Sequence, residues 1–478
     1  MKNRAGVAAL ATLAMLNVFT LGAGVAVADL LPARLALWHV AHVAQVRVAA
    51  PAPVLAPASP RGPAPSKGRL AALLGPMTAA QSLGPHVGAV VTDLGTGTVL
   101  FARNAGSAFV PASNAKLLTA TAALSALGPS AQFTTRVVAG PRPGRLTLVG
   151  GGDPTLAAGP PPRTDYPQPA TLASLAAATA HWLAARGIRT VRLSYDTSRF
   201  TGPATAPGWT PSYISTGNVT PITSLEVDQG RLTHSGAPQD ADDPSNYRPR
   251  SGTPAADAAD AFARLLRRNG VRVVGLPAAG RQPRHAAQVA AVRSPPLASI
   301  VGWMLRESNN VIAEDLARQV ALHAHKPASF SGGAAAVTAI LGRLGVHHGI
   351  HLVDGSGLSP EDQVTPGALA TVVRLAAVSG PGALRAAVTG MPVAGFSGTL
   401  APGQSVFGSF GPRALGMVRA KTGNLAKVSS LAGIAADGSG RVLAFAFMAD
   451  QIHKGSQLPA AATAIDAMAT ALAGCGCR

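Results

Sequence analysis

The apolar positions follow a strand-like pattern at both ends of the chain. Near the beginning, two short apolar stretches, residues 87–93 and 98–103, flank a Gly-Thr-Gly turn and predict a hairpin. Near the end, three further strand-like runs follow one another, at residues 417–421, 428–436 and 441–449. We expect these five segments to form one antiparallel sheet, with the Ala-rich helix predicted at residues 459–472 covering one face. The middle of the chain is therefore an insertion.

Two helical patterns carry polar residues at defined places. Pro111 leads into an Ala- and Leu-rich run that ends near residue 127, and its first turn carries Ser113 and Lys116. Residues three apart on a helix share a face, and the free backbone N–H groups at a helix start stabilise negative charge. We therefore expect Ser113 and Lys116 to face the same site.

The second helical pattern begins near residue 300, and Ser308 falls on its apolar stripe. Asn310 lies two residues later and is almost opposite Ser308 if the helix is continuous. Both side chains can face one cleft only if the backbone leaves helical geometry between residues 307 and 310. We predict such a break.

The N-terminal segment has the pattern of an export signal. Lys2 and Arg4 precede an apolar run over residues 5–28 that ends in Ala-Val-Ala. A run of about 20 residues also spans a bilayer, so residues 1–28 are predicted to be either a signal peptide or an N-terminal membrane anchor. Residues 29–68 are expected to form a stem and a Pro/Ala-rich linker. The protein is accordingly expected to be exported to the outer face of the cytoplasmic membrane or the periplasmic or cell-wall space, anchored or secreted.

Composition narrows the possible partners. The chain has 478 residues, of which 47% are hydrophobic, enough for a large core and more than one domain. The formal charge of +19 is spread over single arginines rather than clustered with aromatics, which argues against nucleic-acid binding. A solvated surface and attraction to a polyanionic cell envelope both remain open. The histidines and cysteines lack the spacing of metal ligands, so we expect no metal and no cofactor.

Three short strings supply the candidate chemistry: Ser113-x-x-Lys116, Ser308-x-Asn310 and Lys421-Thr422-Gly423. A serine hydroxyl becomes a good nucleophile when a base takes its proton, and a neutral lysine amine can be that base. Burial or a nearby positive charge lowers the pKa of such a lysine. We therefore assign Ser113 as nucleophile and Lys116 as general base, with Lys421 supplying the positive charge.

The remaining residues of the strings suit the rest of an acyl-transfer reaction. Ser308 can relay a proton to the leaving nitrogen, and Asn310 can hold a substrate amide. Lys421 and Thr422, followed by Gly423, can bind a terminal carboxylate. The oxyanion is expected between the N–H of Ser113 and that of Asn424.

Each string also has a structural interpretation without catalysis. The first occurs at any exposed helix start, Ser308 can be a small core residue, Asn310 can cap a helix, and the third string can be a strand end running into a turn. Only the third string is specific by itself. A structural origin for all three requires three unrelated coincidences in this order.

Three further sequence motifs accompany the strings: Gly150-Gly-Gly-Asp153-Pro-Thr-Leu156, Val353-Asp-Gly-Ser-Gly-Leu-Ser359 and Phe396-Ser-Gly-Thr-Leu400. Together with the strings they resemble the class C low-molecular-mass penicillin-binding proteins, the D-alanyl-D-alanine carboxypeptidase/endopeptidase family, over about residues 69–454. The resemblance implies an α/β fold. This is the penicillin-binding, serine β-lactamase-like transpeptidase fold, with a five-stranded antiparallel sheet, a helical subdomain and a large inserted domain. The implied catalytic domain comprises residues 69–130 and 286–474, and the inserted domain residues 131–285.

The resemblance also implies a function. Ser113 is acylated by peptidoglycan stem peptides that end in D-Ala-D-Ala and by inhibitory β-lactams, in a serine carboxypeptidase that can also be a DD-endopeptidase. Asp153 resembles the family residue that meets the amino group of a diaminopimelate side chain, although an Asp in this loop is equally suited to cap a turn. Pro360 stands where the family has a basic residue. The alternatives are a serine β-lactamase of related fold and a non-catalytic binder of cell-wall peptide.

Overall fold

The structure is a computed structural model that describes residues 63–161, 166–232, 248–378, 382–410, 412–453 and 457–476. The predicted signal or anchor and most of the predicted linker lie outside these residues. Within the described part of the chain, no helix combines the length and the apolar character needed to cross a membrane. The described residues all belong to one compact unit.

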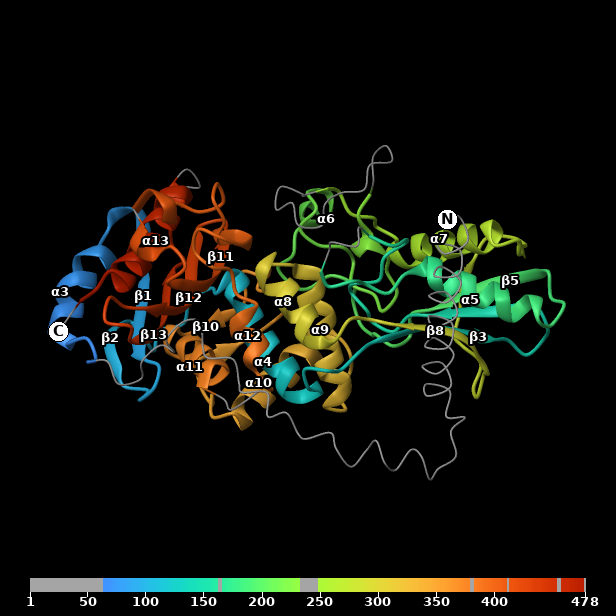
Figure 1. Ribbon diagram of the computed structural model, residues 1–478, viewed down its shortest axis with the longest axis horizontal. Coiled ribbons are helices and arrows are strands. Elements are labelled where there is room, and N and C mark those ends of the chain that lie inside the picture. The colour runs from blue at the N-terminus through green and yellow to red at the C-terminus, as the bar shows by residue number, and fades with distance from the viewer. Residues whose placement is uncertain are drawn as a thin grey trace, which may run out of the picture. The chain divides into compact units, whose positions relative to one another are not determined.

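The first sheet is built from both ends of the chain (Figure 1), as the sequence pattern predicts. It is antiparallel throughout, with the order β11-β12-β13-β1-β2. β1 pairs directly with β13, so Val87 lies opposite Ala449 and the N-terminal hairpin joins the C-terminal meander. The strands are β1 (Val87–Asp93), β2 (Val99–Arg103), β11 (Val418–Leu425), β12 (Val428–Ala436) and β13 (Val442–Ala449).

This sheet is buried on both faces because its strands alternate between two cores. Phe445 and Phe447 of β13 point into a cluster with α3 (Lys67–Thr78) and α13 (Leu458–Ala473). Ala446 and Met448 point to the opposite side, into a helical core. That core is formed by α4 (Ala115–Leu127), α8 (Leu297–Arg306), α9 (Asn310–His323), α10 (Phe330–Arg343), α11 (Pro366–Val378) and α12 (Arg385–Thr389).

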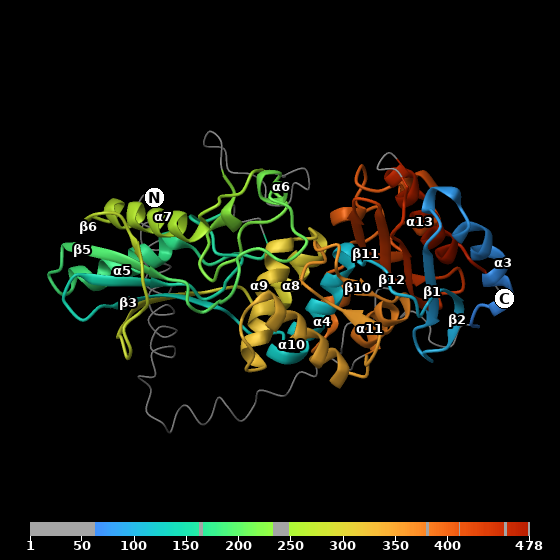
Figure 2. The same cartoon turned by 180° about the vertical axis from the view of Figure 1, so that it is seen from behind.

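A second, six-stranded sheet is formed by the middle of the chain (Figure 2), with the order β6-β5-β4-β3-β8 and β7 beside β5. Its hydrophobic cluster is separate from the other two and includes the buried faces of α5 (Leu172–Ala184) and α7 (Pro254–Arg268). The strands are β3 (Thr134–Ala139), β4 (Arg145–Val149), β5 (Thr190–Asp196), β6 (Arg272–Val273), β7 (Ala278–Ala279) and β8 (Gln288–Arg293). We call residues 134–293 the middle region.

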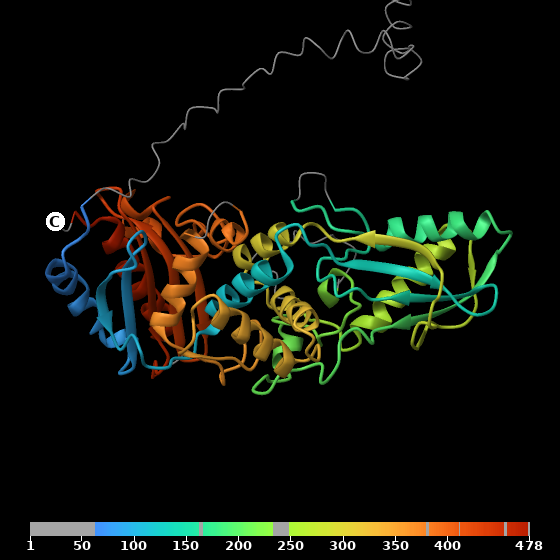
Figure 3. The ribbon, with the colours of Figure 1, turned by 90° about the horizontal axis from the view of Figure 1, so that it is seen from below.

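The domain limits remain predictions, but the strand pairing bears on the predicted end of the inserted domain at residue 285. β8 pairs antiparallel with β3, with Arg293 opposite Thr134, so the second sheet continues beyond residue 285. The chain passes from α4 into this sheet and returns from β8 into α8, as Figure 3 shows from below. In sequence order, the chain therefore enters the helical core at α4, leaves it to form the second sheet, and returns to it at α8. Smaller elements are α6 (Ser212–Ser215), β9 (Ile350–His351) and β10 (Gln363–Val364).

Candidate active site

Ser113 lies in a short 3-10 turn, η2 (Ala112–Asn114), and α4 begins only at Ala115. The predicted single helix is thus split at its first turn. Ala112 has a φ of +48°, a left-handed conformation that costs a residue with a Cβ about 1–2 kcal/mol. The turn is tied to β12 because Asn114 Nδ2 donates to Ser430 Oγ at 2.8 Å. These contacts fix the direction in which the Ser113 side chain leaves the backbone.

Lys116 is the centre of the site and is fully buried. Its Nζ lies 2.9 Å from Ser113 Oγ, 2.6 Å from Asn310 Oδ1 and 2.8 Å from the carbonyl oxygen of Ser356. Burial lowers the pKa of Lys116 to about 7, against the opposing effect of the Asp354, Glu314 and Asp362 carboxylates. A substantial fraction of Lys116 is therefore the neutral amine near neutral pH.

The predicted break between Ser308 and Asn310 is confirmed. α8 ends at Arg306, Ser308 has a φ of +56°, and α9 begins at Asn310. Asn309 caps the new helix, because its Oδ1 accepts a hydrogen bond from the N–H of Ile312 at 3.0 Å. The break lets Ser308 and Asn310 line the same cavity, which a continuous helix does not allow.

Asn310 joins Lys116 to the middle region. Its Oδ1 accepts from Lys116 Nζ, and its Nδ2 donates to the carbonyl oxygen of Asn218 at 2.9 Å. Arg250 stabilises the loop that carries Asn218, because its Nε donates to the carbonyl oxygen of the preceding residue, Gly217, at 3.0 Å. The orientation of Asn310 is thus set from two parts of the chain.

The third string lies on β11, at the edge of the first sheet. Lys421 is fully buried, and both burial and the neighbouring Lys116 hold the pKa of its ammonium well below the usual value. Thr422 Oγ1 donates to Thr399 Oγ1 at 2.8 Å. A Cβ at Gly423 would lie 2.7 Å from the carbonyl oxygen of Pro111, so only glycine lets β11 approach the turn of the nucleophile.

A cavity of about 470 Å³ lies in front of Ser113. Ser308, Asn310, Thr422 and Asn424 line it together with Ser113, while the two lysines and Gly423 lie behind its wall. The middle region closes the other side with Tyr213, Asn218, Arg231 and Arg250. Eight predicted residues from three distant segments are therefore in or directly behind one cavity.

Asp153 is the predicted residue that the fold places elsewhere. It is 3% exposed and is not among the residues that line the cavity. Its Oδ1 accepts hydrogen bonds from the N–H and the hydroxyl of Thr155, at 2.9 and 2.6 Å. Burial raises the pKa of its carboxyl to about 6. Oδ1 thus caps the turn at Thr155, and the role of Asp153 toward a diaminopimelate amino group stays a prediction.

The sequence interpretation gave no role to the carboxylates behind the Asp354–Ser359 loop. Asp354 accepts from the N–H groups of Ser356, Gly357 and Ser359, and Glu314 accepts from those of Gly355 and Ser356. These bonds hold the carbonyl oxygen of Ser356 at Lys116. Glu314 stands four residues after Asn310, but a Glu in a helix that also carries Asp315, Arg318 and Gln319 forms no motif of its own.

The same loop also touches the middle region. Trp209 Nε1 donates to Asp354 Oδ2 at 2.8 Å, and Gly208 packs so closely that a Cβ there would lie 2.9 Å from Pro360 Cδ. Pro360, found where a basic residue was expected, thus packs against the middle region.

The comparisons with known proteins agree with this geometry. The chain is 37% identical over 455 residues to Carboxypeptidase Rv3627c of Mycobacterium tuberculosis, covering 91% of this chain and 92% of the relative. It is 38% identical over 429 residues to Carboxypeptidase DacB of Mycolicibacterium smegmatis, covering 89% and 88%.

The fold resembles that of a solved penicillin-binding protein. Penicillin binding protein 4 (dacB) of Haemophilus influenzae aligns with a TM-score of 0.67 at 23% identity, over 83% of this chain and 98% of that one. Its complex with a β-lactam aligns with a TM-score of 0.60 at 24% identity, over 82% and 98%.

A family model supplies the last comparison. It is described as the D-Ala-D-Ala carboxypeptidase 3 (S13) family and matches residues 70–249 and 232–472, well over half of the chain. The chain therefore belongs to the D-Ala-D-Ala carboxypeptidase 3 (S13) family.

Proposed function

We propose that this serine-type D-Ala-D-Ala carboxypeptidase works through an acyl-enzyme on Ser113. The observation that carries the proposal is the environment of Lys116 Nζ. A neutral amine has two N–H groups and one lone pair; the carbonyl oxygens of Asn310 and Ser356 take the two N–H groups, so the lone pair faces Ser113 Oγ. Lys116 is thereby oriented to accept the proton of Ser113.

Acylation then follows a proton path through the cavity. Ser113 Oγ attacks the carbonyl carbon of the penultimate D-Ala while its proton passes to Lys116. The oxyanion is stabilised by the N–H groups of Ser113 and Asn424. The proton reaches the leaving nitrogen through Ser308, and terminal D-Ala departs. Water then attacks the ester carbon and releases the shortened peptide and free Ser113.

The third string and Asn310 supply substrate binding. The hydroxyl of Thr422 and the positive charge at Lys421 attract the terminal carboxylate of the peptide, and Gly423 keeps the strand close enough for the peptide to lie beside it. Asn310 holds the substrate amide beside Ser113. Burial lowers the pKa of both lysines, and in the proposed division of roles Lys116 is the neutral amine while the bound carboxylate favours the charged form of Lys421.

The proposed substrate is the peptidoglycan stem peptide, with β-lactams as inhibitors that acylate the same serine. A cross-link cleaved by the same acyl transfer makes the protein a DD-endopeptidase as well. Support comes from the family membership and from the β-lactam complex of the H. influenzae protein. We further propose that the protein acts outside the cytoplasmic membrane, because its N-terminal segment has the pattern of an export signal.

The decisive experiment is labelling of the purified protein with a fluorescent penicillin, followed over time. We expect stable labelling that is lost in Ser113→Ala, because no other group is placed to form the ester. Rapid release of the label would instead identify a β-lactamase. Absence of labelling in the wild-type protein, together with no release of D-Ala from a D-Ala-D-Ala peptide, would leave only a peptide binder.

A further inference from the structure

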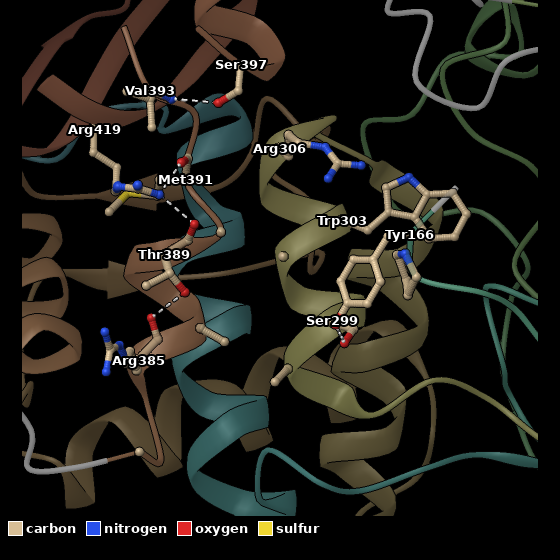
Figure 4. A pocket seen from close by; sticks show the side chains of 16 residues that line it. Tyr166, Ser299, Trp303, Arg306, Arg385, Thr389, Met391, Val393, Ser397 and Arg419 are labelled. Atoms are coloured by element: carbon tan, nitrogen blue, oxygen red, sulfur yellow. Dashed lines mark hydrogen bonds between the residues drawn. The ribbon is translucent and has the colours of Figure 1, made fainter. Parts of the chain in front are cut away.

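A second cavity, of about 560 Å³, lies between α8 and α12, and we call it the α8–α12 groove (Figure 4). Figure 4 shows Trp303 and Arg306 on the α8 side of this groove, and Thr389 and Arg419 on the opposite side. None of its lining residues takes part in the proposed acylation. The groove therefore offers binding space outside the catalytic cavity.

The groove and the catalytic cavity are neighbours on three segments of the chain. Each segment lines the groove with one residue and the catalytic cavity with another residue, one to three positions later. The pairs are Arg306 and Glu307 at the end of α8, Ser397 and Thr399 at η4 (Gly398–Leu400), and Arg419 and Thr422 on β11. The ridge between the two cavities carries no side chain at Gly398, where a Cβ would collide with the carbonyl oxygen of Arg306.

The groove adjoins the part of the catalytic cavity that receives the leaving group. In the proposed reaction, Ser308 passes a proton to the leaving nitrogen, and Thr422 binds the carboxylate next to that nitrogen. Ser308 follows the end of α8 and Thr422 lies on β11, so both belong to segments that also line the groove. Tyr213 and Asn218 of the middle region line the other side of the cavity. A leaving group larger than D-Ala therefore extends toward the groove.

The pairing of β11 prevents such a leaving group from continuing along the strand. Val393 forms an antiparallel bridge with Arg419, and the N–H of Ala420 donates to the carbonyl oxygen of Pro392 at 3.0 Å. The edge of β11 is therefore occupied as far as Ala420, and a bound peptide can pair with it only beyond that residue. The open space next to this point is the groove.

A cross-linked pair of stem peptides supplies a leaving group of this size. The scissile nitrogen then belongs to a diaminopimelate side chain of the second peptide. As Ser113 Oγ bonds to the D-Ala carbonyl carbon, the carbon–nitrogen bond breaks, and the nitrogen takes a proton through Ser308 and leaves as an amine. The leaving peptide also carries a free C-terminal carboxylate, on the D-Ala that follows its diaminopimelate. In an extended peptide, this carboxylate lies about 10 Å from the α-carbon next to the scissile nitrogen.

Arg419 lies at a matching distance. Three residues of a strand span about 10 Å, which is the separation of Arg419 from Thr422 along β11. The NH1 atom of Arg419 donates to the carbonyl oxygens of Thr389 and Met391, at 2.6 and 3.2 Å. These bonds fix the plane of the guanidinium through one of its nitrogens. A planar guanidinium edge matches a carboxylate, which accepts two parallel hydrogen bonds.

The composition of the groove suits this carboxylate and the chain that carries it. Arg306, Arg385 and Arg419 line the groove, and none of the described residues that line it is an Asp or a Glu. Arg306 shares its charge with the catalytic cavity, since its Nε donates to Glu307 Oε1 at 2.8 Å. Trp303 offers apolar surface for the methylene groups of the diaminopimelate.

We propose that the α8–α12 groove is the subsite for the leaving stem peptide of a cross-link, with the C-terminal carboxylate of that peptide bound by Arg419. This inference rests on the proposed function, since it adds a binding site to the same acyl transfer. A single D-Ala is too short to reach the groove. The groove therefore favours endopeptidase cleavage and leaves carboxypeptidase cleavage unchanged.

Two substrates that acylate the same serine and differ in their leaving group test the inference. One is a pentapeptide that ends in D-Ala-D-Ala, and the other is a dimer of two tetrapeptides joined through D-Ala and diaminopimelate. Arg419→Gln removes the charge. Gly302→Gln narrows the groove from the face of α8 that carries Arg306, at a position where a Cβ would meet nothing within 4 Å. Because glutamine favours a helix more than glycine does, this second variant should keep the fold.

The expected result is a loss on one substrate only. In Arg419→Gln, kcat/KM for the dimer should fall about tenfold, the usual loss for one charged hydrogen bond, and kcat/KM for the pentapeptide should stay within about twofold of the wild type. Gly302→Gln should show the same selectivity, because its side chain occupies the space of the leaving peptide. Arg189→Gln, an equal charge change at an exposed position of the middle region, should match the wild type on both substrates.

A dimer whose leaving peptide is amidated at its C-terminal carboxyl group identifies the group that Arg419 binds. The wild-type protein should cleave this dimer about tenfold more slowly than the acidic one. Arg419→Gln should cleave both dimers at the same rate, because the charge that distinguishes them is absent. A wild-type protein that cleaves both dimers equally, or a variant that still prefers the acidic one, would overturn the inference.

The pentapeptide separates the inference from the proposed function. Release of D-Ala from the pentapeptide without cleavage of the dimer, or with equal losses on both substrates in the groove variants, would contradict the inference alone. The same holds if both groove variants cleave the dimer at the wild-type rate. If the wild-type protein neither releases D-Ala nor takes the penicillin label, the proposed function fails, and the inference fails with it.

Discussion

The two sides of the catalytic cavity are built in different ways. On the side of the first sheet and the helical core, side chains do the chemistry: Lys116 and Lys421 are fully buried and lie behind the nucleophile. On the side of the middle region, the contact with Asn310 is made by a backbone oxygen, that of Asn218. Residues that react through their side chains form recognisable sequence motifs, whereas a contact made by the backbone can be provided by any residue that preserves the loop. The catalytic side was therefore evident from the sequence, and the supporting side was not.

The largest expected effect is on the catalytic side. Lys116→Met keeps the approximate volume and removes the amine, so acylation by a fluorescent penicillin should fall by about 10²–10⁴, the usual contribution of a general base. Thermal unfolding should show a folded protein whose stability changes by no more than about 3 kcal/mol, because relief of the desolvated amine opposes the loss of its hydrogen bonds to Asn310 and Ser356. An acylation rate close to that of the wild type would exclude Lys116 as the base.

A smaller effect is expected from the supporting side. Arg250 is 8% exposed and donates to the carbonyl oxygens of Gly217 and Gln229. Arg250→Met should reduce the free energy of unfolding by about 2 kcal/mol and slow acylation about tenfold, as the loop that orients Asn310 loosens. Arg267→Met, on an exposed face of α7, should change the free energy of unfolding by no more than about 0.5 kcal/mol and leave the acylation rate unchanged. Reduced stability with an unchanged acylation rate would mean that the middle region encloses the cavity without orienting Asn310.

The pH dependence of acylation should report the effect of the Glu314 carboxylate on the pKa of Lys116. The neutral fraction of Lys116 increases as pH rises, so the wild-type acylation rate should rise through a midpoint near pH 7 and level off above it. The Glu314 carboxylate raises the pKa of Lys116, so Glu314→Gln should move this midpoint to lower pH and slow the reaction a few-fold at its plateau. A rate profile measured from pH 5 to 9 checks the direction. A midpoint that moves upward would contradict the assigned electrostatics.

The smallest effect concerns the break before α9. Ser308 has a φ of +56°, which glycine adopts at lower cost than alanine. Ser308→Gly should therefore be more stable than Ser308→Ala by about 1 kcal/mol in urea unfolding, although both lack the relay hydroxyl. Both should lose acylation to a similar degree. If alanine were the more stable of the two, the left-handed conformation at this position would be contradicted.

Much of the fold and the site was predictable from local patterns. Alternating apolar residues and turn glycines identified all five strands of the first sheet, and the opposed positions of Ser308 and Asn310 required the break that is present. The end of the second sheet was less predictable, because β8 is a short apolar run whose pairing with β3 depends on a segment 150 residues away. Asp153 was also ambiguous, since a carboxylate that caps a turn and one that binds an amine look alike in a sequence.

By itself, the sequence determined the reactive groups, their order and the two ends of the sheet that carries them, because these depend on residue type and short-range periodicity. Only the tertiary structure decided how the Lys116 amine beside Ser113 is oriented and how far its pKa is lowered. That orientation comes from carbonyl oxygens at residues 310 and 356 and from the carboxylates of Glu314 and Asp354 behind the loop. The physical reason is burial: the pKa of Lys116 depends on how much water and charge surround it, and both are set by segments brought together from across the chain.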